Sequence, residues 1–283
     1  MIVKSFAKIN LSLKITGNRE DGYHYLEMVN LPVDLHDTIE ISRLPNSYDS
    51  YVITDDPDLQ QIDENLCHKA LEAMRERYGF KENFDIRIQK NIPFAAGLGG
   101  GSSNAAAVML AINWMLKLNA KPDDLAEIAL KLGSDVPFFL APRPAYLTGI
   151  GEDIHPIRIK KSYFCVIVKP NTGLSTKEVY QKCDAFPRQN IDTQNVVKGL
   201  EEGDDELIVN SMGNDLMPAA VSMLPEIEKI HKMLLADGFK IASMTGSGST
   251  CFAISPDSRK CKEAAHKYEK LGYNTRFCRV FSK

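Results

Sequence analysis

The chain has 283 residues, of which 44% are hydrophobic and 25% are charged, and its formal net charge is −3 at pH 7. This length and composition suit a globular protein with one large domain or two modest ones, and we expect two. A pI near 6.1 argues against a general surface for nucleic acids or anionic membranes. We therefore expect neither kind of partner, and local groups must bind any anionic substrate.

Three features of the chain favour a cytoplasmic location. A strand-like pattern begins almost at the first residue, without the charged and apolar segments of a signal peptide. The longest apolar stretch, residues 105–118, is too short to span a bilayer. The six cysteines form no C-x-x-C pair and have no histidine at zinc spacing, so we expect buried or incidental thiols, without a metal cluster or a disulfide framework.

The N-terminal part predicts strands with one intervening helix. Apolar and polar residues alternate over residues 9–16, which is the pattern of a half-buried strand. In such a strand, Lys8 lies on the same face as Asn10 and Ser12. The other elements expected before residue 93 are strands at 38–42 and 84–89 and a helix at 65–78 that ends at Gly79.

Residues 93–107 contain four glycines and two serines, and they lead directly into an apolar helix that continues to about Lys117. Glycines can adopt positive φ and approach a ligand closely, and the helix start adds unpaired N–H donors and a positive dipole end. The two serine hydroxyls suit a phosphate oxygen or a phosphate-bound Mg²⁺. The segment predicts a phosphate-binding loop of Pro93, Phe94, Ala95, Ala96, Gly97, Leu98, Gly99, Gly100, Gly101, Ser102 and Ser103.

This loop differs from two common nucleotide-binding loops. A Walker loop requires a lysine before the hydroxyl residue, and here Gly101 precedes Ser102. A Rossmann loop requires the spacing G-x-G-x-x-G, and these glycines are too closely spaced for it. An ordinary Gly/Ser linker is the alternative, although linkers seldom run directly into an apolar helix.

The second half of the chain predicts a domain boundary and a new set of elements. A helix is expected from Pro122 to Gly133, and a break at 142–144 with turn-rich residues 148–152 places the boundary near 145–158. The pattern lacks a long regular βαβ repeat, which favours an α+β fold with sheets covered on one side over a Rossmann sheet. The expected strands cover 163–169, 241–244, 251–254 and 273–281, and the expected helices 176–182, 225–236 and 257–270.

Four motifs, in their order along the chain, carry a resemblance to a known family. They are residues 6–11 with 19–24, the phosphate-binding loop, Gly133-Ser134-Asp135-Val136-Pro137, and the glycine-rich residues 244–251. Together they resemble the GHMP kinases, and weaker markers extend the resemblance over most of the chain. It implies a two-domain α+β GHMP-kinase fold, with an N-terminal ATP-binding domain at 1–155, a C-terminal domain at 156–283 and the active-site cleft between them.

The resemblance also implies ATP- and Mg²⁺-dependent transfer of a phosphoryl group to an alcohol. This reaction needs a base for the hydroxyl proton and positive charge near the reacting oxygen. Asp135 is implied as the general base, and Lys8 as the group that orients this carboxylate and stabilises charge. Taken singly, Asp135 before Pro137 could also be a helix N-cap. Lys8, taken singly, could lie on a solvent-exposed face of its strand. Their occurrence together with the loop favours the catalytic interpretation.

The implied substrate is a methylerythritol linked to cytidine diphosphate, from the non-mevalonate route to isoprenoids. Tyr23 and His24 match residues that contact cytosine, and Tyr180 matches a second aromatic residue that would sandwich the base. Asn10 and Thr176 would hold the rest of this substrate. Taken alone, Asp21-Gly22 before Tyr23 indicates only a turn.

Two weaker sets of candidates complete the site. Residues 245–250 predict a hairpin turn between two strands, whose backbone N–H groups can also help to bind phosphates, and we include Gly246, Ser247 and Gly248 on that ground. Asn65 and Lys90 are candidates for the adenosine side of ATP, from matching position only.

Two other functions are compatible with parts of this pattern. A GHMP kinase for another small alcohol, of the homoserine or mevalonate type, gives no reason for Tyr23-His24 with Tyr180. A non-catalytic, nucleotide-sensing regulator with the same fold would be expected to lack Asp135 or Lys8, and both are present. We expect ATP and Mg²⁺ as cofactors, a small-molecule substrate, and a monomer or homodimer.

Overall fold

The computed structural model describes residues 1–20, 22–45, 47–56 and 65–282, so Asp21 of the second motif segment lies outside the described residues. The chain forms two compact units. The first comprises residues 1–7, 36–92 and 99–142, and the second comprises 8–35, 93–98 and 143–283. Two long strands, β1 (Ile2–Asn18) and β2 (His24–Leu44), contribute residues to both units.

In the first unit, short strands extend the C-terminal part of β2. Strand β4 (Asn83–Gln89) pairs with β2 in antiparallel orientation, with Thr38 opposite Gln89. Strand β3 (Tyr51–Thr54) pairs with β4 in parallel orientation. The backbone of Ile41 also donates to the carbonyl oxygen of Met1 at 2.9 Å, which holds the chain's first residue beside β2.

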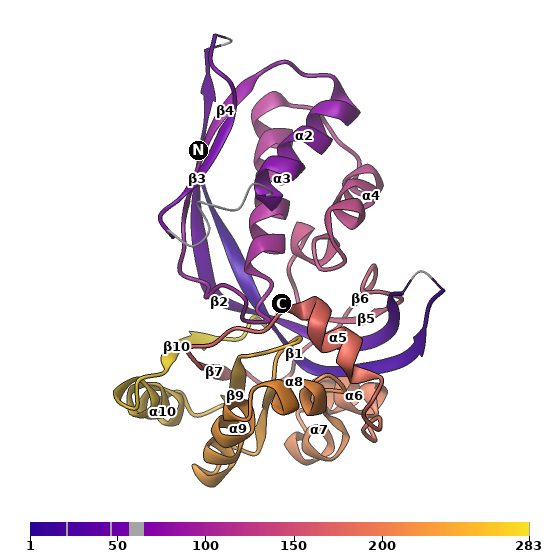
Figure 1. The fold of residues 1–283 in the computed structure, drawn as a ribbon, viewed down its shortest axis with the longest axis vertical. Coiled ribbons are helices and arrows are strands. Elements are labelled where there is room, and N and C mark those ends of the chain that lie inside the picture. Colours follow the sequence, from indigo (N-terminus) through magenta and orange to yellow (C-terminus); the bar gives the residue numbers. More distant parts are fainter. Residues whose placement is uncertain (21, 46, 57–64, 283) are drawn as a thin grey trace. The chain divides into compact units, whose positions relative to one another are not determined.

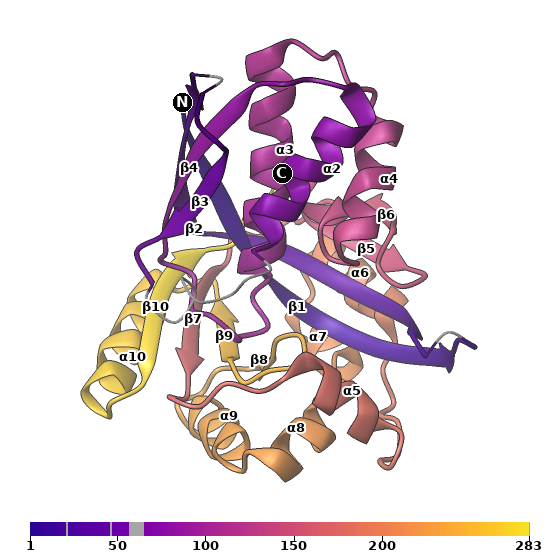
Figure 2. The same ribbon diagram turned by 45° about the horizontal axis from the view of Figure 1, so that its top comes forward.

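The helices of the first unit pack against one another, as Figure 2 shows. They are α2 (Leu66–Tyr78), α3 (Gly100–Leu116), α4 (Pro122–Leu132) and the short 3₁₀ helix η1 (Pro137–Leu140). Helix α3 lies between α2 and η1 and is joined to β1 by a buried hydrogen bond from Ser5 Oγ to Asn104 Oδ1 at 2.6 Å. Within the first unit, this hydrogen bond therefore holds α3 against the first residues of β1.

The second unit contains a four-stranded antiparallel sheet in the order β10-β7-β9-β8. Its strands are β7 (Phe164–Lys169), β8 (Ile241–Met244), β9 (Cys251–Ser255) and β10 (Asn274–Arg279). Helices α9 (Glu226–Ala236) and α10 (Ser258–Lys270) pack on this sheet, and Figure 1 shows α10 beside β10 and β7.

The N-terminal part of β2 carries a second strand arrangement in this unit. Strand β5 (Ala145–Thr148) pairs with residues 28–30 of β2 and with β6 (Asp153–Pro156). The remaining helices are α5 (Thr176–Cys183), α6 (Thr193–Glu202), α7 (Asp205–Ser211) and α8 (Met217–Met223).

The predicted α+β class is confirmed, but burial differs from the expected pattern. Lys8, Asn10 and Ser12 are all buried, so β1 is covered on both faces rather than half-buried. Successive residues are also buried in β7, β8 and β9. The prediction of sheets covered on one side is therefore wrong for these strands, because the side chains on both of their faces are buried.

Several short elements were not predicted: β3, β5, β6, η1, α6, α7 and α8. Strands of four residues and helices of four to ten residues contain only one to three periods, which gives a weak pattern. All six cysteines are free and buried, as expected. Within the described ranges, no helix combines the length and the apolar character that a bilayer span requires.

Candidate active site

Lys8 lies on β1 with only 3% of its surface exposed, and its Nζ donates to Oδ1 of Asn10 at 2.5 Å. The interpretation of Lys8 as a residue on a solvated strand face is therefore wrong. Burial of an ammonium group costs several kcal/mol unless acceptors and opposite charge compensate it. A buried lysine at this position requires such groups, and the side chain of Asn10 is one of them.

The side chain of Asn10 is held by hydrogen bonds on both of its polar atoms. Its Nδ2 donates to Oδ1 of Asn30 at 2.6 Å. Its Oδ1 accepts from the backbone N–H of Gly246 at 2.8 Å and from the hydroxyl of Thr245 at 3.3 Å, in addition to Lys8. With these contacts, Asn10 fixes the position of Lys8 relative to the loop at residues 245–250.

Residues 245–250 form the predicted hairpin turn between β8 and β9, with Thr245 N–H bonded to the carbonyl oxygen of Thr250 at 3.0 Å. All six residues are buried. The N–H of Gly246 donates to Asn10, and the N–H of Gly248 donates to the carbonyl oxygen of Thr245 at 3.0 Å. These two N–H groups, for which the glycine-rich pattern predicts phosphate binding, donate to acceptors within the protein. Ser247 Oγ lies 2.9 Å from Thr176 Oγ1.

The first half of the phosphate-binding loop packs directly on this hairpin. Gly97 has φ +69°, and a Cβ placed there would lie 2.2 Å from the carbonyl oxygen of Thr245. The carbonyl oxygen of Gly97 accepts from Thr245 Oγ1 at 3.1 Å, and that of Leu98 accepts from the N–H of Lys8 at 3.0 Å. Glycine at position 97 is thus required by both conformation and space.

The second half of the loop forms the start of α3 in the first unit. Gly99 is the N-cap in left-handed conformation, φ 72°, and gives the helix no side-chain cap. N–H groups of the first turn are then suited to an anion, and the helix dipole adds favourable potential. Ser102 is partly exposed whereas Ser103 is 3% exposed, so Ser102 offers the accessible hydroxyl. A hydroxyl oxygen beside such donors suits a phosphate oxygen of ATP, or a Mg²⁺ that is bound mainly by those phosphates and by water.

Asp135 lies between the end of α4 and the start of η1, and it is partly exposed. The N-cap of η1 is Val136, and η1 has no side-chain cap. The interpretation of Asp135 as a helix N-cap is therefore wrong. In this turn, the N–H of Val136 is bonded to the carbonyl oxygen of Gly133 at 3.0 Å.

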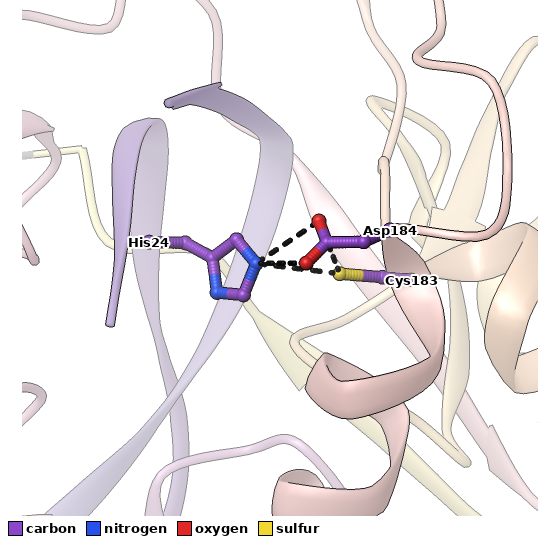
Figure 3. A group of neighbouring side chains, drawn as sticks. All are labelled: His24, Cys183 and Asp184. Carbon is purple, nitrogen blue, oxygen red and sulfur yellow. Dashed lines mark hydrogen bonds and ion pairs between the residues drawn. The ribbon is translucent and has the colours of Figure 1, made fainter. Parts of the chain in front are cut away.

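His24 begins β2 and contacts the end of α5, as Figure 3 shows. Its Nε2 lies 3.2 and 3.3 Å from the two carboxylate oxygens of Asp184 and 3.8 Å from Sγ of Cys183. The ring centroids of His24 and Tyr180 are 5.3 Å apart, with an angle of 37° between the planes. The structure thus brings together two of the three residues that we expected at a base, while Tyr23 next to them is 56% exposed.

Asn65 and Lys90 both have structural contacts in the first unit. Asn65 is the N-cap of α2, and its side chain accepts from the N–H of Cys67 at 2.9 Å. Lys90 forms an ion pair with Asp37, which is fully buried. A Cβ placed on Gly100 would lie 3.5 Å from Nζ of Lys90, so this ammonium also lies near the start of α3. Lys90 therefore adds positive charge where the loop enters the helix.

Four residues that hold the candidate site together were not predicted from the sequence: Asn30, Asp37, Asp184 and, through its side-chain hydroxyl, Thr245. Asn30 gave a signal, because it is a single amide within the apolar run around Val29 and Leu31. The partners of Asp37 and Asp184 lie 53 and 160 residues away in the chain. A pattern of neighbouring residues cannot indicate contacts between residues so far apart in the chain.

Comparison with known proteins assigns this fold to a protein family. The family model described as "GHMP kinases N terminal domain" matches residues 65–142, and the one described as "GHMP kinases C terminal" matches residues 196–274. Curated relatives match almost from end to end. The chain belongs to the GHMP kinases, and its two-domain fold is that of the family.

The individual relatives narrow this class. The 4-diphosphocytidyl-2-C-methyl-D-erythritol kinase of Clostridium tetani is 37% identical over 97% of both chains, and that of Pelotomaculum thermopropionicum is 38% identical over 98% of this chain and 96% of its own. A crystal structure of 4-(cytidine 5'-diphospho)-2C-methyl-D-erythritol kinase superposes with a TM-score of 0.82 at 28% identity, covering all of both chains. Homoserine kinase from Cytophaga hutchinsonii shares the fold, with a TM-score of 0.76 at 19% identity over 99% of this chain and 95% of its own.

Proposed function

We propose that this protein transfers the γ-phosphoryl group of ATP to the 2-hydroxyl of 4-diphosphocytidyl-2-C-methyl-D-erythritol, giving the 2-phosphate and ADP in the non-mevalonate isoprenoid pathway. The end-to-end similarity to kinases named for this substrate carries the proposal. The buried Lys8 with its hydrogen-bonded support and the pairing of His24 with Tyr180 are consistent with it.

The two catalytic residues have different tasks in this reaction. The carboxylate of Asp135 accepts the proton of the 2-hydroxyl as the hydroxyl oxygen bonds to the γ-phosphorus and the bond to the β-phosphate oxygen breaks. The ammonium of Lys8 stabilises the negative charge on the substrate oxygen and orients the carboxylate. Asn10 holds Lys8 in place by its 2.5 Å hydrogen bond, so the charge is fixed before substrate binds.

The loop at residues 93–103 binds the phosphates of ATP through backbone N–H groups at the start of α3 and through the hydroxyl of Ser102. Mg²⁺, bound with ATP through Ser102, would neutralise phosphate charge during transfer. Lys90 adds positive charge near the same helix start, and Asn65, as the cap of α2, supports the adenosine side. The second glycine loop, residues 246–248, acts mainly by holding Asn10 and Thr176.

On the substrate side, Tyr23, His24 and Tyr180 bind the cytosine ring, and Thr176 binds the remainder of the molecule. Tyr23 is exposed and Tyr180 partly exposed, so their rings are accessible to a planar ligand. We also propose a cytoplasmic location, since all six cysteines are free thiols, as is usual in a reducing compartment. The division into domains at residues 1–155 and 156–283 stays a prediction.

The test is ADP release by the purified full chain with ATP, Mg²⁺ and the cytidyl substrate, compared with homoserine and mevalonate. Turnover with the cytidyl substrate alone supports the proposal, and turnover only with another alcohol overturns it. Asp135→Asn should lower kcat by about 10²- to 10⁴-fold. The control is Glu127→Gln, which changes a carboxylate of the same unit that is 63% exposed. An undiminished rate in Asp135→Asn would refute the role of this base.

A further inference from the structure

Asn214 lies in the short loop between α7 and α8, and only 1% of its surface is exposed. Its Nδ2 donates to the carbonyl oxygens of Met244 and Gly246 at 2.8 and 2.9 Å. Its Oδ1 accepts from the backbone N–H of Leu216 at 2.9 Å. A backbone N–H can only donate, so this contact fixes which end of the amide is the oxygen. The NH₂ group of Asn214 therefore faces the hairpin at 245–250.

Gly246 is held by two amide side chains, one on each of its peptide groups. Its carbonyl oxygen accepts from Asn214, while its N–H donates to Oδ1 of Asn10 at 2.8 Å. Gly246 has φ +56°, and a Cβ placed there would lie 3.0 Å from the carbonyl oxygen of Gly97. Because glycine has more backbone freedom than any other residue, contacts must fix the direction of its peptide groups. Asn10 and Asn214 together provide those contacts.

The loop that carries Asn214 is attached to the same strand as Asn10. Leu13 of β1 makes two backbone hydrogen bonds with this loop, both of 2.9 Å. The carboxylate of Asp215, which is 1% exposed, accepts from the N–H of Ile15 at 2.8 Å. Strand β1, the hairpin and the loop thus form a closed ring of hydrogen bonds within the second unit. The hairpin cannot turn relative to β1 unless a contact of Asn10 or Asn214 breaks.

The position of Lys8 depends on this ring, because the oxygen of Asn10 that accepts from Gly246 also accepts from Nζ of Lys8. We infer that Asn214 is a positioning residue for phosphoryl transfer: it fixes Gly246, which fixes Asn10, which directs the ammonium of Lys8. The inference rests on the proposed function, because Lys8 is catalytic only in that reaction. It adds a residue outside the glycine-rich segments to those on which the rate depends.

The alternative is that Asn214 serves stability alone. Loss of buried hydrogen bonds destabilises a fold in either case, so unfolding data do not separate the two roles. The roles differ in how Asn214 is coupled to Asn10. A residue that acts through Asn10 has no further effect on the rate once the amide of Asn10 has been removed, whereas the effects of independent residues multiply.

The test is a double-mutant cycle on kcat, with the purified full chain and the alcohol that the wild type phosphorylates. Asn214→Asp keeps the oxygen that accepts from Leu216 and places a second oxygen against the two carbonyl oxygens. We expect kcat to fall about 10- to 100-fold, with a smaller change in KM for ATP, because a displaced Lys8 affects the reacting oxygen most. In the Asn10→Ala background, the same substitution should lower kcat no further.

Tyr163→Phe is the matched control, because it removes a buried hydrogen bond of the same unit, from the Tyr163 hydroxyl to Asp205 at 2.7 Å. It should lose stability and keep kcat. Losses that multiply in the cycle, an equal loss of kcat in Tyr163→Phe, or an undiminished kcat in Asn214→Asp each overturn the inference. If Asn214→Asp does not fold, Asn214→Ser takes its place, since its hydroxyl can still accept from Leu216 while the donors to the hairpin are lost.

Amide hydrogen exchange of Gly246 tests the structural step without any substrate. Exchange of this N–H should accelerate more in the Asn214 variant than in Tyr163→Phe, and equal acceleration in the two variants overturns the inference. Turnover of homoserine or mevalonate alone contradicts the proposed function, but the cycle is then measured with that alcohol. The failure of the inference and the failure of the proposed function are therefore distinguishable.

Discussion

Oδ1 of Asn10 lies 2.8 Å from the backbone nitrogen of Gly246, and the same oxygen accepts from Lys8 at 2.5 Å. One buried amide thereby connects the proposed catalytic lysine to a loop 236 residues further along the chain. The hairpin at 245–250 thus acts as a support for β1. This arrangement explains why a turn with two glycines is fully buried.

The first prediction concerns this amide. Asn10→Ala removes one acceptor of the buried Lys8 ammonium and the acceptor of the Gly246 N–H, and the unsatisfied N–H should cost about 1–3 kcal/mol in the free energy of unfolding. We expect a lower kcat with a smaller change in KM for ATP, because a displaced Lys8 affects the reacting oxygen most. Denaturant unfolding and steady-state kinetics measure both effects.

Ser12→Ala is the matched control for Asn10→Ala. Ser12 lies two residues further along β1, is fully buried, and its hydroxyl has no hydrogen-bond partner among the described residues. Removal of this hydroxyl should leave stability unchanged or slightly higher. Equal losses in the two variants would show that burial on β1, and not the amide contacts, determines the effect.

The second prediction separates backbone strain from close approach in the phosphate-binding loop. Gly97 and Gly79 have nearly the same φ, +69° and +70°, but only a Cβ on Gly97 would meet another atom, at 2.2 Å from the oxygen of Thr245. Gly79→Ala should cost about 1 kcal/mol from the left-handed conformation. Gly97→Ala should cost at least about 2 kcal/mol more, since the backbone must move, and it should raise KM for ATP.

Thermal or denaturant unfolding of the two glycine variants decides this point. If Gly97→Ala is no less stable than Gly79→Ala, the loop is free to move away from the hairpin. The proposed support of the loop by Thr245 would then be contradicted.

Sequence patterns predicted the elements with several periods and the residues within short motifs. Helix α2 and strand β4 were predicted closely, because alternation and helical spacing are local properties. The burial of Lys8 and Asn10 was not predicted, since a period of two cannot show that a second layer covers the polar face. The role of Asp184 was also missed, because its partner His24 is distant in the chain and the contact depends on how α5 packs.

The third prediction concerns the buried ion pair of the first unit. Asp37 is fully buried, and besides Lys90 it accepts from the backbone N–H groups of Asn91 and Ile92 at 2.7 and 2.8 Å. Lys90→Met leaves this carboxylate without its counter-charge, which should lower the free energy of unfolding by roughly 3–5 kcal/mol. Lys131→Met, at a lysine that is 73% exposed and paired with Glu127, should change it by less than about 1 kcal/mol.

Kinetics of the same variants address the proposed ATP contact of Lys90. Under conditions where Lys90→Met is still folded, we expect a raised KM for ATP, because its ammonium lies near the start of α3. An unchanged KM with the predicted loss of stability would leave Lys90 with a structural role and would remove it from the ATP site.

The last prediction concerns the pH dependence of stability. His231 lies on α9, and its Nε2–H donates to the carbonyl oxygen of Ala242 at 3.1 Å. Burial lowers the pKa of His231 below 6.5, although the hydrogen bond and Glu228 act in the opposite direction. The unfolded chain therefore binds a proton at a higher pH than the folded chain does. The contribution of the neutral imidazole to stability is complete above about pH 6.5 and is lost as the pH falls toward the folded-state pKa.

We therefore expect the free energy of unfolding of the wild type to decrease below about pH 6.5, with a contribution from His231 of at most about 1.4 kcal/mol per pH unit. His231→Gln retains an N–H donor and does not titrate, so this part of the slope should disappear. His266→Gln, at a histidine that is 66% exposed, should keep the wild-type slope. Denaturant unfolding at a series of pH values measures the difference, and equal slopes in wild type and His231→Gln would contradict the assignment.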